Sequence, residues 1–296
     1  MAPQALTGIL VALVTPFKAD GSIDYANLNK HVNRMIDLGV HGIVPGGSSG
    51  EFTTLSFDER KSLIEAVIKA ADGRVPVVAG VGALSTPDGI ELATHHAKAG
   101  ASALMVLPPF YEAPNLDELK EYFKAIHEAS KLPLLYYNIP SITGTNLEPQ
   151  QLASLSEVGV KYLKDTSGNA PALTELLLGQ DKITAFNGWD TLTFYGLAAG
   201  AKGSVWGATN VIPELSVELW NAIGVENDLV KGRKIWDKIW PICKFFEGHG
   251  YAAALKLGMD IRGWSAGDVR KPFIAVASEH RNELAMLLKN AGVKTV

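Results

Sequence analysis

Lys164 is the residue of this chain whose position most directly suggests covalent chemistry. It stands in Lys161-Tyr162-Leu163-Lys164-Asp165-Thr166, where a short apolar run gives way to small polar residues. A lysine at a strand end is usually solvated, and Lys161 already takes the exposed start of this run. Burial of a second lysine disfavours its charged form and leaves an amine that attacks ketones. The run therefore predicts Schiff-base chemistry at Lys164, with Asp165 on the opposite face of the strand.

Two other stretches can serve the same reaction. Pro45-Gly46-Gly47-Ser48-Ser49-Gly50-Glu51 combines two hydroxyls with glycines that let backbone N–H groups approach an anion such as a carboxylate. Tyr136-Tyr137-Asn138-Ile139-Pro140 ends an apolar run with phenols, one of which can carry a proton. Each stretch also has an ordinary interpretation, a tight turn for the first and packing tyrosines for the second. With Lys164, they describe a site for a 2-oxo acid.

The elements that must position these residues follow an alternating pattern. Short apolar, β-branched runs alternate with segments of helical periodicity, which predicts βα units on a parallel sheet. The strand-like runs lie at residues 8–14, 42–44, 75–79, 103–107, 132–137, 160–163, 182–186 and 203–206, and helical patterns begin near residues 25, 56, 86, 116, 148, 170, 191 and 213. Eight such units predict an α/β fold of the (β/α)8 TIM-barrel type, whose active site forms at the carboxyl ends of the strands.

The last part of the chain has no strand pattern. Residues 229–246, 251–257 and 278–291 are predicted as helices, so we expect a barrel over residues 1–224 and a C-terminal helical extension over 225–296, packed as one structural unit. A doubly wound open sheet is the alternative fold, with Gly80-Val81-Gly82-Ala83-Leu84-Ser85 as a degenerate dinucleotide loop. That loop lacks its last glycine and an acidic ribose partner, which disfavours the alternative.

Composition narrows the class of partner. The chain has 296 residues, 47% hydrophobic and 20% charged, with a formal net charge of -4, which provides no basic stripe for nucleic acid and favours a small-molecule substrate. Its apolar runs are too short to cross a membrane, and no signal-peptide pattern opens the sequence, so we expect a cytoplasmic protein. Its single cysteine, Cys243, excludes a disulfide within the chain and a thiolate zinc site.

Two other chemistries fit the sequence poorly. No HExxH motif occurs and the seven histidines form no metal-binding pattern, so we expect neither a metal nor another cofactor. Ser48 and Ser49 match a nucleophile elbow only loosely, with no assigned His and Asp partners, which disfavours a serine hydrolase.

The chain resembles the pyruvate-dependent class I aldolases of the dihydrodipicolinate synthase and N-acetylneuraminate lyase family over nearly its whole length. The motifs that carry the resemblance are Gly47-Ser48-Ser49-Gly50-Glu51, Pro109-Phe110-Tyr111, Tyr137-Asn138-Ile139-Pro140, Leu163-Lys164-Asp165-Thr166 and Asn187-Gly188-Trp189-Asp190. The resemblance implies a homotetramer, a dimer of dimers, that acts on pyruvate and an aldehyde without a cofactor.

The resemblance also implies roles for individual residues. Lys164 would form the imine, Tyr137 would transfer protons, Ser48 and Ser49 would hold the substrate carboxylate, and Tyr111 would reach a neighbouring subunit's site. The expected catalytic residues are thus Lys164, Tyr137, Ser48 and Tyr111, and the expected substrate-binding residues are Gly47, Ser49, Thr166, Gly188, Asp190 and Gly207.

Departures from the family pattern bear on the substrate. Dihydrodipicolinate synthases carry an arginine two residues beyond the Tyr-Asn-Ile-Pro motif, where this chain has Ile142, so a carboxylate clamp is missing. Sialic-acid lyases are similar at Thr166 and Asp190 but have a glutamate in place of Thr191 and a polar residue in place of Gly207. We therefore expect a 2-keto-3-deoxy sugar acid or a similar 2-oxo-4-hydroxy acid as substrate.

Two tryptophans leave a further alternative. Trp189 and Trp206 near the rim would leave room for a more apolar aldehyde, unless they are core or interface residues.

Three functions other than an aldolase are compatible with the sequence. The first is a dehydratase or deaminase on the same scaffold, and the second is 4-hydroxy-tetrahydrodipicolinate synthase, which Ile142 disfavours. The third is a non-catalytic barrel that binds a 2-oxo acid.

Overall fold

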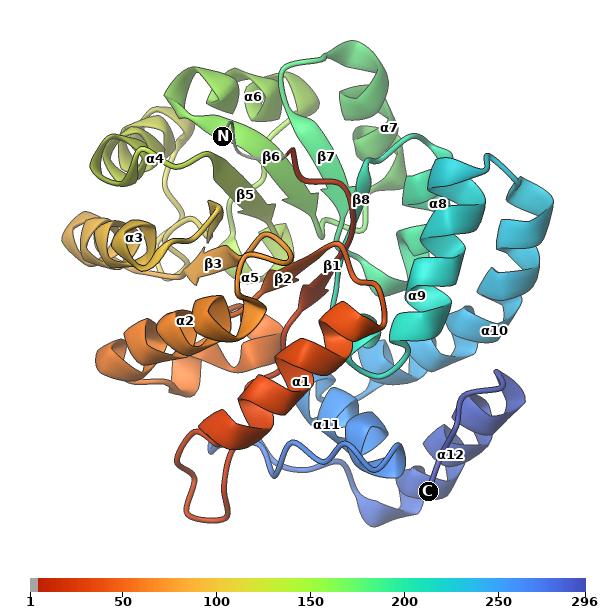
Figure 1. Cartoon of the computed structure of the whole chain (residues 1–296). Coiled ribbons are helices and arrows are strands. Elements are labelled where there is room, and N and C mark those ends of the chain that lie inside the picture. Colours follow the sequence, from red (N-terminus) through yellow and green to blue (C-terminus); the bar gives the residue numbers. More distant parts are fainter. Residues whose placement is uncertain (1–4) are drawn as a thin grey trace.

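The structure, a computed structural model, is a barrel of parallel strands surrounded by helices (Figure 1). It describes residues 5–296; residues 1–4, where the expected barrel domain begins, lie outside the described residues. The strands are β1 (Gly8–Ala12), β2 (Gly42–Val44), β3 (Val78–Val81), β4 (Ala103–Val106), β5 (Leu134–Asn138), β6 (Val160–Asp165), β7 (Thr184–Asn187) and β8 (Gly203–Trp206). They pair in parallel in the order β2-β1-β8-β7-β6-β5-β4-β3.

The barrel closes between β2 and β3. These strands, at the two ends of the pairing order, are joined by a parallel bridge between Ile43 and Val77. The predicted (β/α)8 TIM barrel is confirmed, and the doubly wound open sheet is wrong because that fold leaves two unpaired edges.

Alternation along each strand separates the inside of the barrel from its outside. Leu10, Val44, Met105 and Leu135 fill the interior together with Tyr137. Their neighbours on the strands face outward and pack against the surrounding helices. A side chain on the inner face near a strand's carboxyl end therefore points to the mouth of the barrel.

The surrounding helices follow the strands in order. They are α1 (Tyr25–Asp37), α2 (Phe57–Ala71), α3 (Thr86–Ala99), α4 (Leu116–Ser130), α5 (Pro140–Thr143), α6 (Pro149–Ser154), α7 (Ala170–Gly179), α8 (Thr193–Ala198) and α9 (Pro213–Trp220). Local sequence fixes where several begin: Ser56 and Glu59 form a capping box at α2, and Asn115 and Glu118 form another at α4. Such reciprocal bonds satisfy backbone donors that a helix start leaves free.

Three helices complete the chain: α10 (Leu229–Gly248), α11 (Tyr251–Ile261) and α12 (Arg281–Asn290). They lie along one side of the barrel in Figure 1. Ile239 and Phe246 of α10 share a buried cluster with Ile9 of β1 and Trp206 of β8. The C-terminal helices thus cover barrel residues that would otherwise be exposed to water.

The predicted element boundaries differ from the observed ones by a few residues. β3 begins three residues later than predicted, after Pro76, and β5 begins after Pro133, because proline offers no N–H to a neighbouring strand. β6 continues two residues beyond its predicted end, so Lys164 and Asp165 lie within the strand. Lys164 and Asp165, whose polar side chains suggested that the strand had ended, therefore still pair with β5 and β7.

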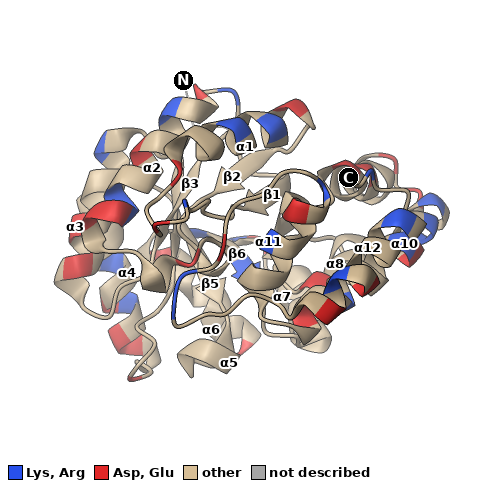
Figure 2. Ribbon diagram, turned by 90° about the horizontal axis from the view of Figure 1, so that it is seen from below, with Lys and Arg blue, Asp and Glu red and all other residues tan. Residues whose placement is uncertain are grey.

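Figure 2 shows Lys and Arg positions interspersed with Asp and Glu positions along the outer helices. In the part of the chain that the structure describes, no helix is long and apolar enough to cross a membrane.

Candidate active site

A pocket of about 360 Å³ opens at the carboxyl ends of the strands. It is lined by Ser48, Ser49, Tyr137, Ile139, Ile142, Lys164, Thr166, Gly188, Trp189, Asp190, Val205, Gly207, Glu247 and Tyr251. Most of the predicted site residues therefore meet around one cavity, although they come from strands or loops far apart in the sequence.

Lys164 and Tyr137 face each other inside the pocket. They are register partners on neighbouring strands, so their side chains point to the same face of the sheet. Lys164 is 6% exposed and Tyr137 is 3% exposed, and the Lys164 Nζ lies 3.9 Å from the centre of the Tyr137 ring. Within residues 5–296 the Lys164 amine has no ion-pair partner. This buried amine lies beside a phenol and opens on a cavity, as a nucleophile toward a ketone requires.

Gly188 is needed because the Lys164 side chain passes very close to it. A Cβ at this position would lie 2.7 Å from the Lys164 Cγ, 2.8 Å from its Cε and 2.3 Å from the Thr166 Oγ1. Any larger residue would displace the lysine. Gly188, predicted as a substrate-binding residue, thus also makes room for the amine.

The hydroxyls of Ser48 and Ser49 lie on a short 3-10 turn, Ser48–Gly50, which residues 45–47 connect to β2. The turn ends at Glu51, a non-glycine residue with a left-handed φ of 55°, a conformation that costs free energy unless its surroundings hold it. The Glu51 carboxylate forms a buried ion pair of 2.8 Å with Lys256 of α11 and accepts a hydrogen bond from the Arg270 backbone N–H. The C-terminal segment therefore holds this loop in place.

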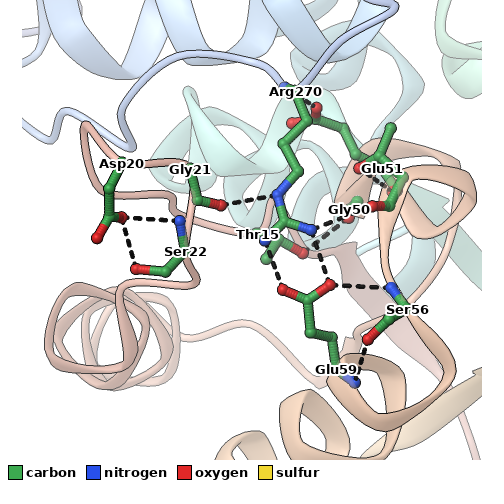
Figure 3. A network of polar contacts seen from close by, with 10 residues as sticks. Thr15, Asp20, Gly21, Ser22, Gly50, Glu51, Ser56, Glu59 and Arg270 are labelled. Carbon is green, nitrogen blue, oxygen red and sulfur yellow. Dashed lines mark hydrogen bonds and ion pairs between the residues drawn. The ribbon is translucent and has the colours of Figure 1, made fainter.

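Arg270 joins several parts of the chain around that loop (Figure 3). Its guanidinium donates to the carbonyls of Gly21 and Thr54 and to both carboxylate oxygens of Glu59. On the other side of the loop, the Thr15 hydroxyl donates to the Gly50 carbonyl at 2.8 Å. This Arg270 network fixes the loop at both of its flanks.

Asp190 lines the pocket and is 5% exposed. Burial, the largest cause, and the nearby charge of Glu247 together raise the pKa of its carboxyl to about 7, although the Tyr251 hydroxyl, which donates to both carboxylate oxygens at 2.8 Å, acts to lower it. Burial also raises the pKa of the Tyr251 phenol well above its usual value. Asp190 and Tyr251 are thus joined by a hydrogen bond inside the pocket.

Tyr251 also explains the glycine at position 207. A Cβ on Gly207 would lie 2.4 Å from the Tyr251 hydroxyl oxygen and 2.9 Å from the Ser49 Oγ. The space that a polar side chain at this position would fill is taken by the phenol of α11.

Thr166 and Asp165 point in different directions. Thr166 lines the pocket, and its hydroxyl oxygen is buried without a hydrogen-bond partner among the described residues, so its expected contact with a substrate stays a prediction. Asp165 is bound instead to the Asn138 amide at 2.7 Å and to the Ser167 hydroxyl. The expectation that Asp165 faces away from Lys164 is confirmed.

Four residues singled out in the sequence lie elsewhere or only at the edge. Tyr111 is 88% exposed and lines a separate hollow, and Gly47 does not line the pocket; a Cβ at Gly47 would meet Met105. Trp206 is fully buried outside the barrel, so the interpretation as a rim aromatic is wrong for it, whereas Trp189 does line the pocket. Ile142 lies at the pocket mouth, 58% exposed.

Two polar lining residues were missed by the sequence analysis, Glu247 and Tyr251. Both belong to the C-terminal extension, which was expected to pack on the barrel rather than to reach its mouth. No motif distinguishes them, because a glutamate ending one helix and a tyrosine starting the next are common in any helical segment.

The titratable groups of the pocket do not resemble a metal centre. Residues 5–296 contain no group of three or more His, Cys, Asp or Glu side chains that could hold a metal ion.

The comparisons with known proteins agree with this geometry. Residues 5–291 match the model of the dihydrodipicolinate synthetase family. The chain is 34% identical over 288 residues to a 4-hydroxy-tetrahydrodipicolinate synthase of Methanocaldococcus jannaschii, covering 97% of this chain and 99% of that protein. It is also 34% identical over 292 residues to an uncharacterized DapA-like lyase of Halobacterium salinarum, covering 98% and 96%.

A solved structure of similar shape is a chloride-inhibited dihydrodipicolinate synthase of Acinetobacter baumannii complexed with pyruvate. Its TM-score is 0.94 at 30% identity, with 98% of this chain and 100% of that chain covered. Fold, site and sequence thus agree, and the chain belongs to the dihydrodipicolinate synthetase family, whose members are lyases.

Proposed function

We propose that this lyase is a reversible class I aldolase that cleaves a 2-keto-3-deoxy sugar acid or a similar 2-oxo-4-hydroxy acid to pyruvate and an aldehyde. The observation that carries the proposal is the buried amine of Lys164, 3.9 Å from the Tyr137 ring centre and open to the pocket. The pyruvate in the similar Acinetobacter baumannii structure supports a 2-oxo acid as the ligand.

The proposed reaction begins with attack of the Lys164 amine on the C2 ketone and loss of water. The protonated imine then draws in the electrons of the C3–C4 bond, while the C4 hydroxyl gives its proton toward Tyr137 and becomes the aldehyde. The remaining enamine takes up a proton at C3, and hydrolysis of the imine releases pyruvate. Ser48 and Ser49 would bind the substrate carboxylate, and Thr166, which also lines the pocket, would meet a substrate hydroxyl.

A second candidate is 4-hydroxy-tetrahydrodipicolinate synthase, the name carried by the Methanocaldococcus jannaschii relative. The residue at the pocket mouth disfavours it, because Ile142 offers no positive charge to a second carboxylate.

We also propose that the chain forms a homotetramer. The side chain of Tyr111 is 88% exposed and could pack in an interface between subunits. Analytical ultracentrifugation tests the number of subunits.

Borohydride trapping tests the imine. Incubation with pyruvate and borohydride is expected to add one reduced pyruvate to Lys164, as located by peptide mass spectrometry, and Lys164→Ala is expected to gain no mass. Lys161→Ala, which removes an exposed lysine from the same strand, is the matched control and should be trapped normally. An adduct on another lysine, or full turnover by Lys164→Ala, would overturn the proposal.

Product analysis separates the reaction types. A panel of 2-keto-3-deoxy acids is expected to release pyruvate and an aldehyde in equal amounts. Formation of an oxo acid with the carbon chain intact would instead identify a dehydratase or deaminase, and trapping without any turnover would identify a binding protein.

A further inference from the structure

We infer that Glu247 of α10 is a specificity-determining residue that selects substrates with an uncharged, hydroxyl-bearing tail and rejects those with a second carboxylate. The inference rests on the proposed aldolase function, which it deepens. Glu247 lies outside the barrel in sequence, yet its side chain lines the pocket that contains Lys164.

The position of the Glu247 carboxylate is set by Thr191. The Thr191 backbone N–H donates to the Glu247 Oε1 at 2.9 Å, and the Thr191 hydroxyl lies 3.1 and 3.0 Å from its two oxygens. The Trp189 indole N–H donates to that same hydroxyl at 3.1 Å. Since the Thr191 oxygen accepts from the indole, its own hydrogen is directed to the carboxylate.

The charges around the pocket are unbalanced. Its ionisable lining residues are Lys164, Tyr137, Tyr251, Asp190 and Glu247, so Lys164 is the single cation among them. Once Lys164 has become part of the substrate imine, its charge lies next to the substrate's first carboxylate. A second carboxylate at the other end of the substrate would then face two acidic side chains and no cation.

Hydroxyl groups would meet a different environment. Carboxylate oxygens accept hydrogen bonds from hydroxyl donors, so the Glu247 side chain that lines the pocket can accept from a hydroxyl of a neutral tail. A polyol tail can thus donate to Glu247, whereas an anionic tail would be repelled by it.

The test compares two substrates in variants of the intact protein. Cleavage of 2-keto-3-deoxygluconate, which has a neutral tail, is compared with cleavage of 4-hydroxy-2-oxoglutarate, which ends in a carboxylate. Glu247→Gln keeps the shape and removes the charge, and it is expected to shift the ratio of the two kcat/KM values at least about tenfold toward the dicarboxylate.

Asp237→Asn is the matched control. It removes one negative charge from the same helix at an exposed position ten residues away, about 15 Å along the axis, and should leave the ratio unchanged. Thr191→Val, which removes the hydroxyl that orients Glu247, is expected to shift the ratio in the same direction by a smaller factor. Added salt should raise the wild-type rate on the dicarboxylate and leave that of Glu247→Gln nearly unchanged, because salt screens the repulsion at this exposed rim.

Failure of this inference differs from failure of the aldolase proposal. Pyruvate trapping is measured in every variant, so a loss of imine formation is distinguished from a change in tail selectivity. If the wild-type protein is trapped and cleaves, but its ratio equals that of Glu247→Gln or already favours the dicarboxylate, the inference alone is wrong. If the wild-type protein is not trapped at Lys164, the aldolase proposal falls, and the inference with it.

Discussion

Among the pocket residues, Asp190 also affects how the free energy of unfolding depends on pH. Its carboxyl is buried, its pKa is raised to about 7, and an unfolded aspartate titrates near 3.8. Between these two values the folded state binds more protons than the unfolded state, so the free energy of unfolding falls as pH rises through this window. This is the reverse of the usual contribution of an ion-paired aspartate.

We expect Asp190→Asn to remove this dependence. Between pH 5 and pH 8 the wild-type protein should lose about 2 to 3 kcal/mol of unfolding free energy relative to the variant, as measured by urea denaturation at each pH. Tyr251→Phe is the companion variant: without the phenol that donates to Asp190, the charged carboxylate is less stabilised and the pH-dependent loss should persist. Parallel pH profiles for wild type and Asp190→Asn would contradict the prediction.

The chemical role of an individual residue could be predicted from the sequence only where that residue type is unusual at its position or belongs to a family motif. Lys164 was singled out because a lysine is unusual at the end of an apolar strand, whereas the choice of Tyr137 over Tyr136 came from the family resemblance. Glu247 was not found, because its role depends on the hydroxyl of Thr191, which lies 56 residues away in the sequence. Such a contact leaves no local pattern.

Among the elements, the loop after β2 depends most on distant parts of the chain. Its Glu51 is fully buried and pairs with Lys256, which is 4% exposed. Burial lowers the pKa of the Lys256 ammonium, and the Glu51 charge opposes that shift. Removing one partner from such a pair leaves an uncompensated buried charge.

Lys256→Met is therefore expected to lower the free energy of unfolding by about 3 to 5 kcal/mol. Glu51→Gln combined with Lys256→Met leaves no buried charge and should be less destabilised than Lys256→Met alone, which a double-mutant cycle measures by urea denaturation. Because Glu51 lies two residues after Ser49 and ends the turn that carries both serines, both variants should also raise the KM for pyruvate more than they lower kcat. Additive effects in the cycle would show that the pair contributes no coupling.

The elements themselves were largely predictable from the sequence. Periodicity and capping residues predicted the eight βα units, because each strand and helix is formed by local patterns that recur along the chain. The order of the strands around the barrel follows from those units. The path of the segment after α11 was not predictable: Arg270 is held by Gly21, Thr54 and Glu59, and these contacts exist only after the barrel has formed.

For the whole molecule, the question is whether the barrel and its C-terminal helices unfold together. Ile239 of α10 is fully buried in a cluster that includes Ile9 of β1 and Trp206 of β8. Pocket residues come from both parts too, Lys164 from the barrel and Glu247 from α10. We propose that the chain is one cooperative unit, since separating the parts would expose this shared cluster to water.

Ile239→Ala tests the proposal. It is expected to lower the free energy of unfolding by about 2 to 5 kcal/mol, because it leaves a cavity at the boundary between helix and barrel. Hydrogen exchange, followed by mass spectrometry on peptides from β1, β8 and α10, should rise in all three together. Met286→Ala on α12, where the side chain is 60% exposed, is the control and should change stability by less than about 0.5 kcal/mol. Faster exchange confined to α10, with β1 and β8 still protected, would show that the helices open independently and that the barrel alone supports the buried amine of Lys164.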